Sequence, residues 1–301
     1  MPIDSDGKNM IGAAVKSMRP RQWVKNIFVA GPLVFARLVG EPRAALRTAA
    51  AFGIFCVLSS TVYLINDLVD LEKDRAHPVK RRRPIASGAL SPDAARALAA
   101  ALGLLALVGA TLLGPGVGFA GTAAAYLILN LAYSLWLKKI AFVDVACLSA
   151  FFLMRVLAGA FAIPVPASRW LLVCTLLLSA LLGFGKRAHE LRVSGDGGRA
   201  QRDVLGRYHL PTLRRLMGVL GVLTTVTYLV YTRSMHAREV FNVELIWTVP
   251  FVAFGIFRFN WIVGRKADAE SPTDSMLRDP LFVANLVAYG VTVVLLLHAG
   301  R

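Results

Sequence analysis

Residues 100–126 read AALGLLALVGATLLGPGVGFAGTAAAY and contain no charged side chain. Two apolar runs, 95–113 and 117–136, meet at the Gly-Pro-Gly sequence of residues 114–116. A helix needs about 20 mostly apolar residues to cross the hydrocarbon core of a bilayer. The many Gly and Ala residues allow such helices to pack closely in lipid. The stretch therefore predicts two consecutive transmembrane helices.

Apolar runs recur along all 301 residues, of which 56% are hydrophobic and 17% charged. This composition argues against a soluble two-domain enzyme. It predicts an all-α, polytopic membrane protein with nine transmembrane helices in a single domain over residues 1–301. The first run is interrupted by Gly31, Pro32 and Arg37, and is also compatible with a position in the membrane interface. The nine runs lie near residues 27–40, 46–65, 95–113, 117–136, 143–162, 170–185, 213–231, 243–263 and 280–299.

The charge is strongly positive, with 34 Lys and Arg against 18 Asp and Glu, a net +16. With nine spans, 24 of the 34 basic residues fall on the side of the N-terminus. The positive-inside rule then predicts that the N-terminus and the longest polar loops face the cytoplasm. Nucleic-acid binding is disfavoured, because the basic residues are divided among short loops and form no soluble module.

Acidic residues gather in the segment YLINDLVDLEKDRAHPVKRRRPIASG, residues 63–88, which closes the second run. Asn66, Asp67, Asp70 and Asp74 are three or four residues apart, which places them on one helical face. Carboxylates at this spacing repel one another and meet the negative end of the helix dipole. The arrangement therefore requires a cation.

Two interpretations of this cation remain open. The neighbouring basic residues, Lys73, Arg75 and those of 80–83, form surface ion pairs with the aspartates. Alternatively, Asn66, Asp67, Asp70 and Asp74 hold Mg²⁺, and the arginines bind phosphate oxygens. We favour the second, because a generic polar loop would rarely combine this acidic face with a cationic cluster and an Arg83-Pro84 corner. The three aspartates are then the candidate catalytic residues.

The pattern Asn66-Asp67-x-x-Asp70-x-x-x-Asp74, followed by the sequence RPIASG of residues 83–88, resembles the first aspartate-rich motif of the UbiA-type intramembrane prenyltransferase superfamily. Tyr133-Ser134, Leu137-Lys138 and Asp144-Val145 resemble its fourth- and fifth-helix signature. The resemblance covers nearly the whole chain. It implies nine helices around a central cavity open to the cytoplasm, with Mg²⁺ joining the acidic motif to a diphosphate.

One departure from the superfamily pattern concerns its second Asp-x-x-x-Asp motif, where residues 185–191 of this chain read GKRAHEL. Together with RPRQWVKN at residues 19–26, this resembles the branch that transfers phosphoribose from phosphoribosyl pyrophosphate to decaprenyl phosphate. That branch supplies precursors of cell-wall arabinan, so the resemblance implies a multi-pass protein of a bacterial inner membrane. It makes phosphoribosyl pyrophosphate, a polyprenyl phosphate lipid and the membrane the expected partners. A homo-oligomer is compatible with the sequence.

The resemblance and the charge pattern together define the candidate substrate-binding residues. Cations are expected to hold the phosphate groups, Tyr133 to face the cavity, and Glu190 to orient a cation or a ribose hydroxyl. The expected set is Lys25, Asn66, Lys80, Arg81, Arg83, Tyr133, Lys138, Lys186, Arg187 and Glu190.

Two other functions compete with phosphoribosyl transfer. Prenyl transfer from a prenyl diphosphate to an aromatic acceptor is disfavoured by the missing second aspartate pair, and a non-enzymatic carrier of anionic lipids by the Mg²⁺-type ligands. Residues 186–211 are expected to form a cytoplasmic lid, with a mobile linker as the alternative. Arg155, inside the fifth run, is expected to face the cavity or to pair with Asp144, because a charge in lipid is costly.

Overall fold

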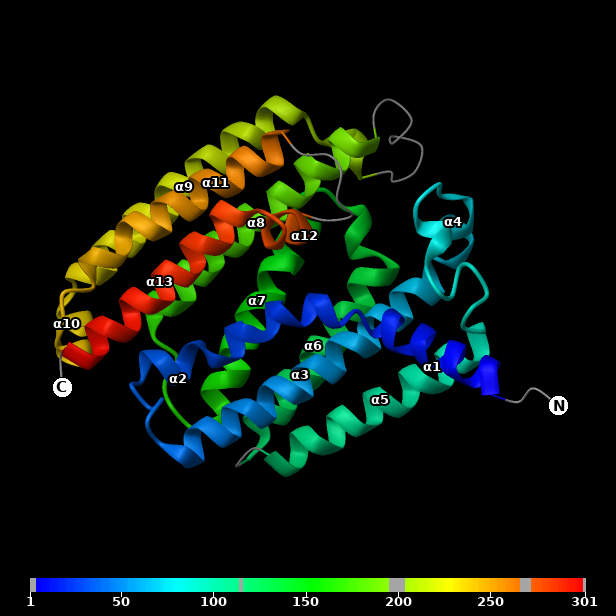
Figure 1. Cartoon of the computed structure of the whole chain (residues 1–301), viewed down its shortest axis with the longest axis horizontal. Helices are drawn as coiled ribbons and strands as arrows, with labels where there is room; N and C mark the ends of the chain where they lie inside the picture. The colour runs from blue at the N-terminus through cyan, green and yellow to red at the C-terminus, as the bar shows by residue number, and fades with distance from the viewer. Residues whose placement is uncertain (1–3, 114–115, 195–203, 266–271, 300–301) are drawn as a thin grey trace. The chain divides into compact units, whose positions relative to one another are not determined.

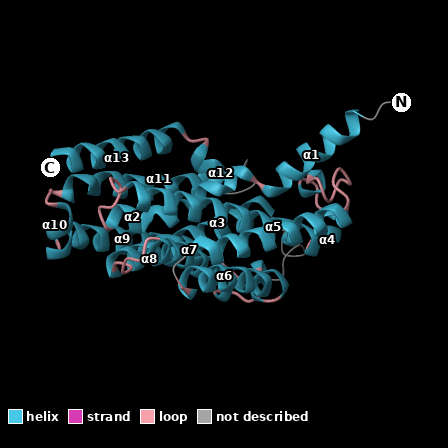
Figure 2. Ribbon diagram, turned by 90° about the horizontal axis from the view of Figure 1, so that it is seen from below, coloured by secondary structure: helices cyan, strands magenta, loops and turns pink. Residues whose placement is uncertain are grey.

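The computed structural model describes residues 4–113, 116–194, 204–265 and 272–299, which contain helices and no strand (Figures 1 and 2). The all-α prediction is confirmed for these residues. The chain forms two compact units, each considered by itself below. Unit 1 comprises residues 1–34, 38–138 and 154–167, and unit 2 comprises 35–37, 139–153 and 168–301.

Seven helices are long and apolar enough to cross a membrane, and they confirm seven of the nine predicted runs. Six of these are single α-helices, and the seventh joins the short 3-10 helix η6 to α11. They are α3 (Pro42–Val69), α5 (Pro92–Leu113), α6 (Val117–Leu135), α7 (Val143–Ala162), α8 (Arg169–Ser194), α9 (Leu210–Arg233) and η6 (Leu245–Thr248) with α11 (Val249–Arg265).

The two terminal runs differ from the prediction. Residues 27–40 form no continuous helix: the 3-10 helix η1 (Pro20–Ala30) leads into the short α2 (Gly31–Phe35), and Arg37 has a φ of 56°. Pro32 lacks a backbone N–H and cannot continue an α-helical hydrogen-bond ladder. The last run forms α13 (Pro280–Ala299), whose apolar stretch of Pro280–Leu296 is shorter than the seven spans. The count of nine spans is therefore not confirmed.

The expected lid, residues 186–211, is partly helical. Helix α8 continues to Ser194 instead of ending near residue 185, so the first third of the expected loop is helix. The apolar and small residues before Lys186 run into a good helix-forming sequence, and no Pro or Gly stops it before Gly195. The middle of the expected lid, 195–203, lies outside the described residues. The chain resumes with the 3-10 helix η5 (Leu205–Arg207).

Unit 1 is built around α3, which lies beside α5 (Figure 1). At one end of this pair, Leu64 and Ala95 form a buried cluster with Ile85 and with Ala13 of α1 (Asp4–Met18). At the other end, the Arg47 guanidinium donates to the carbonyl oxygens of Leu113 and Ala162, each at 2.7 Å. Arg47 thus satisfies carbonyl groups at the C-terminal ends of α5 and α7.

Unit 2 is a stack of long helices in which α11 lies between α9 and α13 (Figure 2). Leu181 of α8, Met217 of α9 and Phe259 of α11 belong to one buried cluster. A bidentate ion pair joins Arg258 of α11 to the buried Asp279, with distances of 3.0 and 2.9 Å, just before α13 begins. Short helices α10 (Met235–Phe241) and α12 (Pro272–Leu277) complete the unit.

Gly159 generates a prediction about stability, because a Cβ there would lie 2.0 Å from the Val29 carbonyl oxygen. We expect Gly159→Ala to force α7 away from η1 and to destabilise the protein by about 1–3 kcal/mol. Gly53→Ala is the matched control, since a Cβ at Gly53 meets nothing within 4 Å. Thermal inactivation followed by size-exclusion chromatography of the detergent-solubilised protein measures the difference. Equal midpoints for the two variants would contradict the close approach.

Candidate functional site

The acidic residues lie where α3 passes into the short helix α4 (Leu71–Ala76). The Asp70 N–H donates to the Asn66 carbonyl at 3.0 Å, and the Asp74 N–H to the Asp70 carbonyl at 2.8 Å. These bonds span four residues, so the helical path continues through the junction and keeps the side chains on successive turns. The spacing predicted from the sequence is confirmed.

Arg83 bridges two of these carboxylates. Its Nη1 lies 2.6 Å from Asp74 Oδ2 and 3.1 Å from Asp67 Oδ1. Arg19 Nη2 reaches the same Asp67 oxygen at 2.5 Å. Asp67 and Asp74 are each only 3% exposed. Burial raises the pKa of the Asp74 carboxyl above its ordinary value, and the positive charge of Arg83 opposes this rise.

Asp70 and Asn66 take their partners from the segment around the end of α6. Lys138 Nζ donates to both carboxylate oxygens of Asp70, at 2.8 and 2.9 Å. The Ser134 hydroxyl hydrogen-bonds Asn66 Oδ1. Each of the four predicted oxygen-bearing side chains therefore has a hydrogen-bond partner, and each aspartate has a cationic one.

Of the other cations expected in unit 1, Lys80 is near enough to Asp74 to lower the pKa of that carboxyl. The Arg81 side chain is exposed and forms no hydrogen bond or ion pair with any described residue. Lys25 is half-buried in η1, and Tyr133 is buried in α6 beside Ser134. The structure thus brings together Asn66, Asp67, Asp70, Asp74, Lys80, Arg83 and Lys138.

Sequence reasoning missed Arg19 and Ser134 as members of this group. Arg19 adopts a left-handed backbone, φ 53°, between α1 and η1, and its guanidinium also lies 5.1 Å from the Tyr63 ring centroid. Both residues stood inside motifs quoted for the family resemblance, Arg19 before Pro20 and Ser134 after Tyr133. Their position within those motifs could have indicated a role, but the spacing of neither residue from the aspartates predicts a contact with them.

The two interpretations of the acidic segment both find support here. The ion-pair interpretation is realised by partly buried pairs. Arg83 was among the expected cations, whereas Arg19 and Lys138 take the place of the adjacent Lys73 and Arg75. The donor set also fits Mg²⁺, which takes carboxylate and amide oxygens together with substrate phosphates and water. Among the described residues, no three His, Cys, Asp or Glu side chains are grouped closely enough to hold a metal by themselves. A metal here would depend on substrate oxygens.

The residues expected near the end of α8 lie in unit 2. The side chain of Arg187 is fully buried, with Nε 3.2 Å from Asp144 Oδ2 and an ion pair from Nη1 to Glu190 Oε2 at 2.5 Å. Lys186 is half-buried. Arg187 therefore contacts two carboxylates of its own unit, Asp144 and Glu190.

Tyr208, which follows η5, completes this group. Its hydroxyl donates to Asp144 Oδ1 at 2.6 Å and accepts from the Phe142 N–H at 2.7 Å. Burial, together with the hydrogen bond to Asp144, raises the pKa of Tyr208 above its ordinary value, so the hydroxyl stays protonated. Asp144 thus connects the start of α7 to α8 and to the segment before α9.

Arg155 is buried within unit 1. Its Nε donates to Asn26 Oδ1 and its Nη2 to the Tyr126 hydroxyl, each at 2.7 Å. These neutral oxygens from η1 and α6 provide the partner that a buried guanidinium requires. The expected pairing with Asp144 is replaced by hydrogen bonds to Asn26 and Tyr126, whereas Asp144 is itself paired with Arg187 and Tyr208.

The Tyr208 hydroxyl generates a second stability prediction. Tyr208→Phe leaves the Phe142 N–H and Asp144 Oδ1 without this partner, which costs about 1–3 kcal/mol. Tyr231→Phe is the control, because the Tyr231 hydroxyl is buried and hydrogen-bonds to no described residue. Thermal inactivation in detergent compares the two variants. A Tyr208→Phe midpoint equal to that of Tyr231→Phe would show that the hydrogen bonds to Phe142 and Asp144 contribute nothing to stability.

Known proteins resemble this chain over almost its full length. A decaprenyl-phosphate phosphoribosyltransferase of Mycobacterium tuberculosis is 34% identical, covering 95% of this chain and 94% of the relative. One of the same name from Corynebacterium glutamicum is 31% identical, covering 97% and 88%. A solved UbiA homolog from Archaeoglobus fulgidus, bound to DMAPP and Mg²⁺, superposes with a TM-score of 0.66 at 15% identity, covering 95% of this chain and 97% of its own.

The model of the UbiA prenyltransferase family matches residues 27–286. This range contains the acidic junction of α3 and α4 and the Arg187 group. The solved homolog has a similar fold, and the sequences of the curated relatives align with both units of this chain. The chain belongs to the UbiA prenyltransferase family.

Proposed function

We propose that this protein transfers the phosphoribosyl group of phosphoribosyl pyrophosphate to a polyprenyl phosphate and releases pyrophosphate. A phosphate oxygen of the lipid forms a bond to C1 of the ribose as the bond from C1 to the pyrophosphate oxygen breaks. Pyrophosphate leaves with the electron pair of the broken bond. The transition state is oxocarbenium-like, as in other glycosyl transfers.

One observation carries the proposal: the three clustered aspartates are paired with three cations. The aspartates are Asp67, Asp70 and Asp74, and the cations are Arg19, Arg83 and Lys138. Donor and acceptor together bring three phosphate-bearing groups, and charge-assisted hydrogen bonds from Arg and Lys suit them. At residues 186–190, the one carboxylate, Glu190, is paired with Arg187. The relatives named decaprenyl-phosphate phosphoribosyltransferase support the same reaction.

Asn66, Asp67, Asp70 and Asp74 are the residues that would hold a magnesium ion. When bound, it would supply positive charge that stabilises the leaving pyrophosphate. Arg83 and Arg19 share Asp67, so they are placed to exchange a carboxylate oxygen for a phosphate oxygen when the donor arrives. Lys138, which donates to Asp70, is placed to make the same exchange. Catalysis then depends mainly on positioning and charge stabilisation, because the acceptor phosphate is already ionised near neutral pH.

We place the reaction at the cytoplasmic face of a bacterial inner membrane, with the N-terminus inside. The apolar spans support a membrane location, and the excess of Lys and Arg in the loops on the N-terminal side supports the orientation. The soluble donor is then available from the cytoplasm and the lipid acceptor from the bilayer. The product would serve the synthesis of cell-wall arabinan precursors.

The reaction is tested with purified full-length protein in detergent, Mg²⁺, polyprenyl phosphate and labelled phosphoribosyl pyrophosphate. We expect pyrophosphate release matched by one phosphoribosylated lipid, and no turnover when either substrate is omitted. Prenyl diphosphate with an aromatic acceptor is the second arm. Turnover in that arm alone would replace the proposal by prenyl transfer, and lipid binding without turnover in both arms would favour a carrier.

The acidic group is tested by Asp67→Ala and Asp70→Ala. We expect each to reduce Mg²⁺-dependent transfer by at least about 100-fold, because each removes charge that positions the metal and the departing pyrophosphate. Asp93→Ala is the control, since Asp93 pairs only with Arg96 on the exposed start of α5 among the described residues. Full activity of Asp67→Ala, with normal yield and monodispersity, would contradict the role of this carboxylate.

A further inference from the structure

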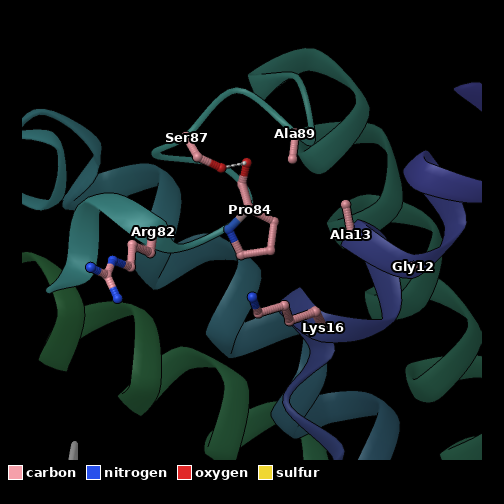
Figure 3. A pocket seen from close by; sticks show the side chains of 7 residues that line it. All are labelled: Gly12, Ala13, Lys16, Arg82, Pro84, Ser87 and Ala89. Atoms are coloured by element: carbon pink, nitrogen blue, oxygen red, sulfur yellow. Dashed lines mark hydrogen bonds between the residues drawn. The ribbon is translucent and has the colours of Figure 1, made fainter.

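A cavity of about 290 Å³ lies between α1 and the segment that leads from η2 (Lys80–Arg82) to α5 (Figure 3). From α1 it is lined by Gly12, Ala13 and Lys16, and from the other side by Arg82, Pro84, Ser87 and Ala89. Figure 3 shows the Lys16 side chain reaching toward Pro84. None of these seven residues belongs to the carboxylate site of Asp67, Asp70 and Asp74.

Neither cation of this cavity has an acidic partner within the part of the chain that the structure describes. Lys16 and Arg82 are both exposed, and neither forms an ion pair or a hydrogen bond with a described side chain. The remaining lining is small and mostly apolar, and the Ser87 hydroxyl donates to the Pro84 carbonyl at 3.2 Å. The cavity therefore offers positive charge beside an apolar wall, a combination that is complementary to an anionic headgroup.

The position of the cavity in the chain places it at the edge of the bilayer. The segment 82–89 is the last part of the connection between α3 and α5, which are adjacent spans. The outer surface of α5 is apolar and exposed, with Leu104 and Leu105 66% and 61% exposed. On α1, Ile11 and Val15 are one turn apart, 66% and 48% exposed, on a face next to the one that lines the cavity. Such a helix packs its apolar face into the lipid interface.

We propose that this cavity binds the phosphate of an anionic phospholipid, with Lys16 and Arg82 as its cationic ligands and the acyl chains lying against the apolar face of α1. The site is distinct from the carboxylate site, although it uses the same two segments. Arg83, next to Arg82, turns to Asp67 and Asp74, and Arg19, three residues after Lys16, also reaches Asp67. A bound lipid would thus link the two segments that deliver these arginines.

Native mass spectrometry of the full-length protein in a non-ionic detergent tests the site, with dioleoyl phosphatidylglycerol as the anionic probe and dioleoyl phosphatidylcholine as its zwitterionic match. We expect one phosphatidylglycerol to bind in preference to phosphatidylcholine. The double variant K16E/R82E should weaken that binding by about tenfold or more, because two charge-assisted contacts become repulsive. The charge-conserving K16R/R82K should stay within about twofold of the wild type.

The double variant R233E/R238E is the matched control, since it makes the same change of charge at two exposed arginines around the junction of α9 and α10. We expect it to bind phosphatidylglycerol as the wild type does. Unchanged affinity of a monodisperse K16E/R82E protein, or equal affinity for the two lipids, would overturn the proposal. Inorganic phosphate is the third probe, and its displacement of phosphatidylglycerol at millimolar concentration would assign the site to free phosphate instead of lipid.

Discussion

The bridge from Arg83 to Asp67 and Asp74 is the interaction on which the acidic site depends. Asp67 and Asp74 are seven residues apart, about two helical turns, and both are buried. Two such carboxylates repel each other and lose hydration, and this cost is offset only if a cation lies between them. Arg83 supplies this cation from the turn after η2, in which the Pro84 carbonyl accepts a hydrogen bond from the Leu90 N–H at 3.0 Å. The corner fixes the segment that carries Arg83, and Ile85 anchors it in the core of unit 1.

This arrangement explains how a carboxylate-rich site can also receive anions. Each aspartate is already compensated by a cation, so the group of Asp67, Asp70 and Asp74 with Arg19, Arg83 and Lys138 is close to neutral. In the proposed reaction, the cations of this group would meet the donor diphosphate, and its carboxylates would meet the metal ion. Neither the carboxylates nor the cations then lose their opposite charges on binding, which limits the desolvation cost.

Periodicity predicted the seven long spans and the placement of Asn66, Asp67, Asp70 and Asp74 on successive turns, because both follow from local helix geometry. The prediction from periodicity was wrong at residues 27–40, where the apolar run forms no continuous helix around Gly31-Pro32. It was also wrong beyond residue 185, because α8 continues past the end of the apolar run. Of the cations that pair with the aspartates, Arg83 was expected from the sequence, but Arg19 and Lys138 were not. Arg19 and Lys138 are distant in sequence from Asp67 and Asp70, and only tertiary packing brings such pairs together.

The strongest change to the sequence interpretation concerns residues 186–190. Sequence reasoning counted Lys186 and Arg187 together as substrate cations that replace a second metal site. The structure buries the Arg187 side chain completely and pairs it with Asp144 and Glu190, two carboxylates of unit 2. The argument against a second metal site becomes stronger, because Glu190 is the one carboxylate of that segment and a guanidinium already holds it. Lys186 is half-buried and next to Arg187 in sequence, and its role in binding a phosphate stays a prediction.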